Sequence, residues 1–164
     1  MTDLWIANDH GGYDLKKEIM HYLDQINHPY NDMGCHSDRI VRYPYYAARV
    51  AAAVSRGEIK RGILICSTGI GMSMIANRYP GVRASLCKST YDARMTREHN
   101  DANILCLGGK TTGEFEAIDI VQTWLITPFQ GGRHTISLDL IKEAEADMIR
   151  PGRIWNPGIP TEDA

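Results

Sequence analysis

The sequence predicts an α/β domain of the doubly wound, Rossmann-like type, with a five-stranded parallel sheet, helices on both faces and an extra C-terminal helix. Short apolar segments alternate with longer segments of helical periodicity, a pattern typical of βαβ units. The short segments are almost entirely apolar, which suits strands that are buried on both faces. The length of 164 residues is that of one domain with one main core.

Four pairs of strand and helix define the predicted domain, and two weaker elements complete it. The strands are expected at 4–7, 63–66, 82–87 and 104–107, and the helices that follow them at 15–26, 70–77, 91–99 and 118–126. Residues 29–33 form a weaker strand candidate. The alanine-rich stretch 45–54 favours a helix that ends near Gly57, since glycine commonly terminates helices.

The C-terminal part is predicted to contain one more helix and a tail. The helix is expected over 133–149, with Ile136 and Leu140 on one face. Residues 151–164 contain three prolines and two glycines, which disfavour a regular element. We therefore expect a single domain over 1–150 and an irregular tail over 151–164.

Composition excludes several classes of partner. A net charge of -2 and a pI near 6.3 give no general attraction to nucleic acid or to an anionic membrane. No apolar run approaches the roughly 20 residues that cross a bilayer, and the first residues lack the features of a signal peptide. The four cysteines show no C-x-x-C spacing, so neither a zinc site nor a disulfide framework is indicated. Free thiols fit a reducing compartment, and we expect a cytoplasmic protein.

Polar, glycine-rich segments follow three of the predicted strands. In an open parallel sheet, ligands bind beyond the carboxyl ends of the strands. These ends carry residues 8–12, 66–71 and 108–111. A dinucleotide site is not expected, because Met74 stands where the third glycine of the fingerprint would be. A P-loop is not expected either, because Ile104 occupies the position of its first glycine.

Cys66 is the most informative of the candidate residues. It lies where a strand runs into the start of a helix, and Gly69 and Gly71 allow backbone amides to turn towards it. Amides and a helix N-terminus stabilise a thiolate, so Cys66 could act as a base or as a nucleophile. A buried structural cysteine is an equally open interpretation here, and it fits Cys87 and Cys106 better.

Histidines and cations supply further candidates. Asp9-His10 and His99-Asn100-Asp101 place an imidazole beside polar neighbours at the end of an element, as proton transfer near neutral pH requires. Lys110 and Arg133 are candidate phosphate ligands. For Lys110, a solvated surface position is an almost equal alternative.

Together these motifs resemble the ribose-5-phosphate isomerase type B family, which includes the galactose-6-phosphate isomerase subunits. The resemblance covers residues 3 to about 141. It rests on Asp9-His10, Tyr43-Pro44, Ile65-Cys66, Thr68-Gly69-Ile70-Gly71, Ala76-Asn77, Gly81-Val82-Arg83-Ala84, His99-Asn100-Asp101 with Asn103, and Gly131-Gly132-Arg133-His134.

The resemblance implies an aldose–ketose isomerase for phosphorylated sugars, with no metal or organic cofactor. It implies a homodimer with active sites between subunits, in some members paired into a tetramer. Cys66 would be the base and Thr68 would assist it, while His99 would open the sugar ring with Asp9 nearby. The substrate-binding residues would be Ser67, Gly69, Ile70 and Gly71 at the enediolate, His10, Lys110 and Arg133 at the phosphate, and Tyr43 and Asn100 along the site.

Several positions depart from the family pattern. Ser137 stands where an arginine is usual, Lys110 replaces another arginine, and Arg42 and Lys88 are cations where other residues are common. Ribose 5-phosphate and ribulose 5-phosphate are the default substrate pair. The departures favour, as an alternative, a hexose 6-phosphate such as galactose or allose 6-phosphate, or another pentose or tetrose phosphate. A non-catalytic phosphosugar-binding domain has less support.

Overall fold

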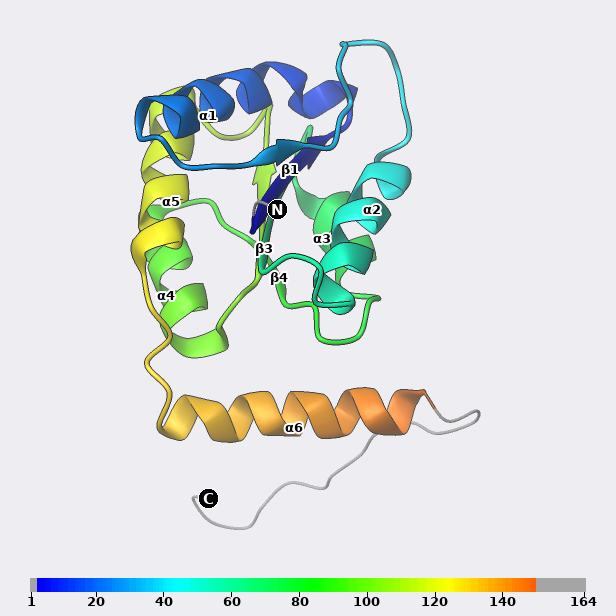
Figure 1. The fold of residues 1–164 in the computed structure, drawn as a ribbon, viewed down its shortest axis with the longest axis vertical. Helices are drawn as coiled ribbons and strands as arrows, with labels where there is room; N and C mark the ends of the chain where they lie inside the picture. The colour runs from blue at the N-terminus through cyan, green and yellow to red at the C-terminus, as the bar shows by residue number, and fades with distance from the viewer. Residues whose placement is uncertain (1–2, 150–164) are drawn as a thin grey trace. The chain divides into compact units, whose positions relative to one another are not determined.

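The computed structural model describes residues 3–149, and the chain divides into two compact units that meet at Gln130 and Gly131. The first unit contains the sheet and five α-helices, and the described part of the second contains helix α6 (Figure 1). The predicted single domain over 1–150 stays a prediction. The predicted tail, 151–164, lies outside the described residues.

Five parallel strands form one sheet in the order β2-β1-β3-β5-β4. Their bounds are β1 Leu4–Asn8, β2 Asn31–Asp32, β3 Arg61–Cys66, β4 Ala84–Leu86 and β5 Ile104–Gly108. The three central strands are almost completely buried. Burial on both faces explains why the sequences of these strands are continuously apolar rather than alternating.

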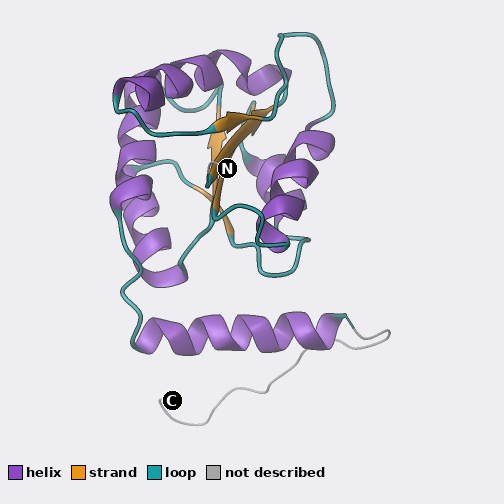
Figure 2. Cartoon of the chain, viewed as in Figure 1, coloured by secondary structure: helices purple, strands orange, loops and turns teal. Residues whose placement is uncertain are grey.

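Helices cover both faces of the sheet, which confirms the predicted doubly wound fold. Helices α1 (Tyr13–Gln25), α4 (Thr90–Asn100) and α5 (Glu114–Ile126) lie on one side, and α2 (Tyr43–Ser55) and α3 (Ile70–Ala76) lie on the other (Figures 1 and 2). A short 3₁₀-helix, η1 (His10–Gly12), joins β1 to α1. Each face of the sheet has its own core cluster.

The two core clusters differ in the side chains that fill them. Trp124 of α5 is fully buried with the isoleucines and leucines of the first face. On the second face, the alanines of α2 allow that helix to approach the sheet closely, and Cys66 belongs to this cluster. Side chains of one strand alternate between the faces, so Ile65 lies in one cluster and Cys66 in the other.

The two weaker elements of the first unit were predicted in the right places but with different lengths. The strand expected over 29–33 is only two residues long, because it pairs with β1 alone at the edge of the sheet. The helix expected over 45–54 begins two residues earlier, since Pro44 occupies one of its first positions, where proline is well tolerated. Gly57 follows the end of this helix with a positive φ of 71°.

The second unit contains helix α6, Arg133–Met148, which is one residue shorter than expected. Its N-cap, Gly132, has a positive φ of 58°, which glycine adopts without strain. Among the residues described, no helix is both long and apolar enough to span a membrane.

Candidate active site

Backbone hydrogen bonds connect the segments that follow the carboxyl ends of β1, β3 and β5. The amide of Asp9 donates to the carbonyl of Ile65 at 3.0 Å, and the amide of Gly109 donates to the carbonyl of Cys66 at 2.7 Å. The amide of Lys110 donates to the carbonyl of Ser67 at 3.0 Å. The three polar segments singled out in the sequence therefore form one surface at the carboxyl edge of the sheet.

The loop from Cys66 to Gly71 directs a backbone amide at the Cys66 sulfur. The amide of Gly69 donates to Sγ at 3.1 Å, and Cys66 is only 5% exposed. Gly69 has φ 75°, and a Cβ added there would lie 2.5 Å from a methyl of Leu86 and 2.9 Å from the carbonyl carbon of Leu107. Only glycine fits this turn, so residue 69 is fixed by both conformation and space.

Cys66 differs from Cys87 and Cys106 in the surroundings of its sulfur. Burial raises the pKa of the Cys87 thiol to about 11 and raises the pKa of the Cys106 thiol well above its ordinary value. Neither of those sulfurs accepts a backbone amide in the hydrogen bonds that the structure shows for them. The interpretation of Cys87 and Cys106 as structural residues agrees with this, whereas Cys66 has the hydrogen-bond donor that stabilises a thiolate.

Tyr43 and Thr68 lie beside this loop. The ring of Tyr43, the first residue of α2, packs so closely against Gly71 that a Cβ on Gly71 would be 2.7 Å from Cζ. The Thr68 hydroxyl accepts from the amide of Ile70 at 3.4 Å. Ile70 itself is exposed, next to the half-buried Ser67 and Thr68. The structure thus brings these predicted residues together around Cys66.

Asp9 and His10 lie on the neighbouring turn. Asp9 is buried, and its Oδ1 accepts from the amide of Gly11 at 2.8 Å, which caps η1. The Nδ1 of His10 lies 3.2 Å from the carbonyl oxygen of Val41 and 3.3 Å from its amide nitrogen. Val41 therefore provides a partner for either tautomer of His10. Gly11 approaches Ser67 so closely that a Cβ there would overlap the serine hydroxyl.

His99 and Asn100 lie at the opposite edge of the sheet from Cys66. They are the last two residues of α4, and Asn103, three residues beyond Asn100, accepts a hydrogen bond at its carbonyl from the amide of Gly62 at 2.9 Å. Gly62 pairs with Ile104, while Cys66 pairs with Gly108. Four residues of strand separate the two edges by roughly 13 Å. The structure does not bring these two predicted residues to the cysteine of their own chain.

The two predicted phosphate ligands lie in different units. Lys110 is exposed directly after β5 and belongs to the carboxyl edge that carries Cys66. Arg133 is the exposed first residue of α6 in the second unit.

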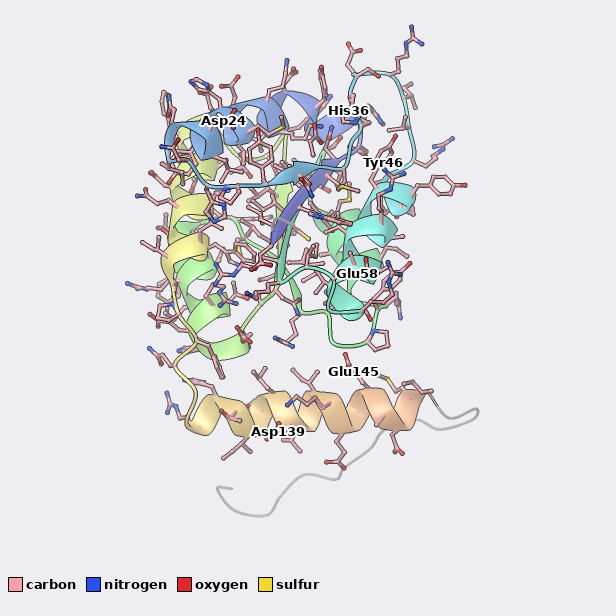
Figure 3. The ribbon with its side chains drawn as sticks, in the orientation of Figure 1. Asp24, His36, Tyr46, Glu58, Asp139 and Glu145 are labelled. Carbon is pink, nitrogen blue, oxygen red and sulfur yellow. The ribbon has the colours of Figure 1, made fainter. Side chains whose placement is uncertain are left out.

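Sequence reasoning missed a buried lysine that supports the His10 side of the site. Lys16 is 1% exposed, and its Nζ donates to both oxygens of Asp32, at 2.8 and 2.9 Å, and to the carbonyl of Cys35 at 2.7 Å. Asp32 also contacts His36, a residue of the segment after β2. The side chain of His36 lies near that of Tyr46 on α2 (Figure 3). In the sequence Lys16 looks like an ordinary surface lysine of an amphipathic helix, so no local pattern could have identified it.

We expect Lys16→Met to lower both stability and substrate affinity. The substitution leaves the Asp32 carboxylate and the Cys35 carbonyl without their buried donor, which costs about 3 kcal/mol in free energy of unfolding. The segment 33–42 then holds Val41 less firmly against His10, so KM for a sugar phosphate rises. Urea denaturation and steady-state kinetics measure the two effects.

Lys17→Met is the matched control, because Lys17 is the next residue of α1 and its contacts, an ion pair with Asp14 and a position over the Tyr13 ring, lie at the exposed surface. Its free energy of unfolding should change by no more than about 0.5 kcal/mol. Equal stabilities and equal KM values for the two variants would contradict the role given to Lys16.

Comparison with known proteins identifies the family of the chain. The Ribose/Galactose Isomerase family matches residues 4–141, which is most of the chain. The chain belongs to this family. The resemblance inferred from its motifs is thereby confirmed.

Relatives within the Ribose/Galactose Isomerase family are similar over almost their whole length. Ribose-5-phosphate isomerase B of Escherichia coli (strain K12) is 42% identical over 145 residues, which cover 88% of this chain and 97% of that protein. The structure of Clostridium thermocellum ribose-5-phosphate isomerase B has a TM-score of 0.86 and 49% identity, covering 88% of this chain and 98% of that one. The Mycoplasma genitalium enzyme, solved with bound ribulose-5-phosphate, has a TM-score of 0.84 and 38% identity, covering 88% and 96%.

Proposed function

We propose that this protein is an aldose–ketose isomerase that interconverts ribose 5-phosphate and ribulose 5-phosphate. Membership of the Ribose/Galactose Isomerase family and similarity to ribose-5-phosphate isomerase B of several organisms support the reaction and the substrate. The observation that carries the proposal is the Cys66 sulfur, which accepts the Gly69 amide at 3.1 Å at the carboxyl edge of the sheet. A sulfur held in this way can exist as a base beside a bound sugar.

The reaction follows from the groups around Cys66. The Cys66 thiolate removes the proton from C2 of the open-chain aldose, and the electron pair of that C–H bond moves to form an enediolate with negative charge on O1. Backbone amides of the Ser67 to Gly71 loop stabilise this charge, with the Thr68 hydroxyl as a further donor. A proton then passes from the O2 hydroxyl to O1, which leaves the negative charge on O2. The Cys66 thiol returns its proton to C1 as the electron pair on O2 forms the C2 carbonyl, and the thiolate is regenerated.

We propose further that the working site is built from two copies of the chain. His99 and Asn100 lie at the amino edge of the sheet, roughly 13 Å along the strands from Cys66. A second copy can bring its own His99 to the carboxyl edge of the first. The exposed side chains of Ile70 and Met74 beside the cysteine loop support this, since apolar surface next to a site favours contact with another subunit. The dimer is the minimal form, and two dimers can pair into a tetramer.

We assign the other predicted residues to this two-copy site as follows. His10 and Lys110, on the Cys66 edge, and Arg133, at the start of α6, bind the phosphate as cations or hydrogen-bond donors. Asp9 assists ring opening by His99 of the partner subunit, and Tyr43 lines the sugar site over Gly71. We place the protein in the cytoplasm, which the four free cysteines support.

The test of this function is a panel of sugar phosphates assayed with the purified protein. We expect isomerisation of ribose 5-phosphate with a higher kcat/KM than that of galactose 6-phosphate or allose 6-phosphate. A higher kcat/KM for a hexose 6-phosphate would assign the alternative substrate, which Ser137 in place of the usual arginine favours. Binding of ribose 5-phosphate without turnover of any sugar in the panel would instead identify a phosphosugar-binding domain.

A further inference from the structure

We propose that Asp101, held between Arg97 and Arg83, is a positioning residue that fixes the His99 imidazole for ring opening at the neighbouring subunit's site. This inference rests on the proposed function. The sequence analysis gave none of these three residues a role of its own. Asp101 directly follows His99 and Asn100 in the sequence.

Asp101 ends α4 in a left-handed conformation, with φ 44° and ψ 44°. A residue other than glycine in this conformation costs of the order of 1 kcal/mol and persists when its surroundings hold it. The Asp101 carboxylate is the group that is held. Its Oδ1 accepts from Nη1 of Arg97 at 2.8 Å and its Oδ2 accepts from Nη2 of Arg83 at 3.0 Å.

Arg83 fixes the last carbonyls of the helix. Its Nε donates to the carbonyl of Asn100 at 2.9 Å, and its Nη2 donates to the carbonyl of Asp101 at 2.9 Å. The backbone amide of Arg83 in turn donates to the side chain of Asn103 at 2.8 Å. The backbone on the C-terminal side of His99 is therefore tied to the segment that leads into β4.

Arg97 connects the same turn to the segment after α5. It is 5% exposed, and its Nη1 also donates to the carbonyl of Ala102 at 2.7 Å. Its Nε donates to the carbonyl of Thr127 at 3.3 Å, and its guanidinium lies 5.8 Å from the ring centroid of Trp124. The amide of Gln130 donates to the carbonyl of Glu98, the residue before His99, at 3.1 Å. Both sides of His99 are thus held in place.

This network is more elaborate than the end of a helix requires. The turn after α1 has the same left-handed conformation at Asn27, with φ 52°, and it forms without any charged side chain at that position. Burying the Arg97 guanidinium costs desolvation energy, and a buried ion pair is often no more stabilising than apolar packing. Two arginines on one carboxylate fix the position of Asp101 and of the backbone around it. His99 and Asn100 directly precede Asp101, so their positions are fixed as well.

The test separates ring opening from proton transfer. Ribose 5-phosphate exists largely as a closed furanose, whereas ribulose 5-phosphate stays open-chain because its O5 carries the phosphate. Isomerisation of ribose 5-phosphate therefore requires ring opening, but exchange of a C1 hydrogen of ribulose 5-phosphate for solvent deuterium requires only the enediolate step. We expect Asp101→Asn to slow the isomerisation about tenfold and to change the exchange rate less than about twofold.

Two further variants define the comparison. Asp101→Gly removes the carboxylate but adopts the left-handed turn freely, so it should show the same selective loss even if Asp101→Asn folds poorly. Asp92→Asn is the matched control, because Asp92 caps the other end of α4, where its Oδ2 accepts from the amide of Lys88 at 3.0 Å. The ratio of the two rates should be unchanged in Asp92→Asn.

His99→Asn and the NMR signal of the His99 imidazole distinguish a failure of this inference from a failure of the proposed function. We expect His99→Asn to show the same selective loss, and the His99 signal to shift in Asp101→Asn. An unshifted His99 signal in Asp101→Asn would overturn the positioning role. So would an equal slowing of isomerisation and exchange in the Asp101 variants, if His99→Asn slows isomerisation alone. Unselective behaviour of His99→Asn would instead refute its part in ring opening.

Discussion

Cys66→Ala is expected to reduce kcat for ribose 5-phosphate isomerisation by about 10² or more, because a general base contributes a factor of about 10² to 10⁴. The variant removes the one sulfur that accepts the Gly69 amide, at 3.1 Å. KM should change much less, since the groups assigned to the phosphate are untouched. Exchange of substrate hydrogen with solvent deuterium, followed by NMR, should be lost together with turnover.

Cys106→Ala is the matched control for the Cys66 variant. Both sulfurs belong to the core cluster under α2 and α3, so both substitutions leave a small cavity in the same environment. Burial keeps the pKa of the Cys106 thiol well above its ordinary value, and this residue therefore remains a neutral thiol. We expect Cys106→Ala to lose some stability but to keep kcat. A kcat for Cys66→Ala within tenfold of the wild type would reject Cys66 as the base.

Refolding two impaired variants together is expected to restore activity. When Cys66→Ala and His99→Asn chains are combined, unfolded and refolded together, hybrid dimers contain one site with an intact Cys66 and an intact His99. Random pairing makes half of the dimers hybrid, so about a quarter of the wild-type sites should be active. Refolded alone, Cys66→Ala should keep about 1% of the wild-type rate or less, and His99→Asn should keep about a tenth of it.

The expected recovery follows from the positions of the two residues within one chain. Cys66 ends β3 at the carboxyl edge of the sheet, and His99 lies near the end of α4 at the amino edge. The control is the same two variants refolded separately and then combined, because that sample contains both kinds of homodimer but no hybrid. Failure of the co-refolded mixture to exceed this control, in samples shown to contain hybrid dimers, would place the whole site within a single chain.

Much of the fold could be predicted because the buried strands have unambiguous sequences. The segments that form β3 and β5 are short, apolar and followed by glycine, which leaves few alternatives to a parallel sheet. The strand β2 was harder, because a two-residue edge strand has no hydrophobic pattern of its own. The first turn of α2 was also difficult to predict. From sequence alone, a proline in the first turn of a helix cannot be told from a proline that interrupts one.

The part of the site near Cys66 could be predicted because sequence neighbours supply most of it. Residues 66–71 cover the end of β3, the turn after it and the start of α3. The rule that ligands bind at the carboxyl ends of strands places them beside Asp9 and His10. The supporting contacts of Lys16 and Arg97 could not be predicted, because each depends on which distant carbonyls and carboxylates surround the side chain. The opposite placement of His99 depends on the direction of α4, which only the assembled sheet reveals.

The separation of Cys66 from His99 within the chain has a consequence for how activity arises in time. In the two-copy site that we propose, a newly synthesised copy carries the Cys66 sulfur at one edge of its sheet and the His99 imidazole at the other. It acquires full catalytic competence only on meeting a second copy. At low concentration, the total activity then rises more than linearly with the concentration of chains, because the fraction of chains in dimers also rises.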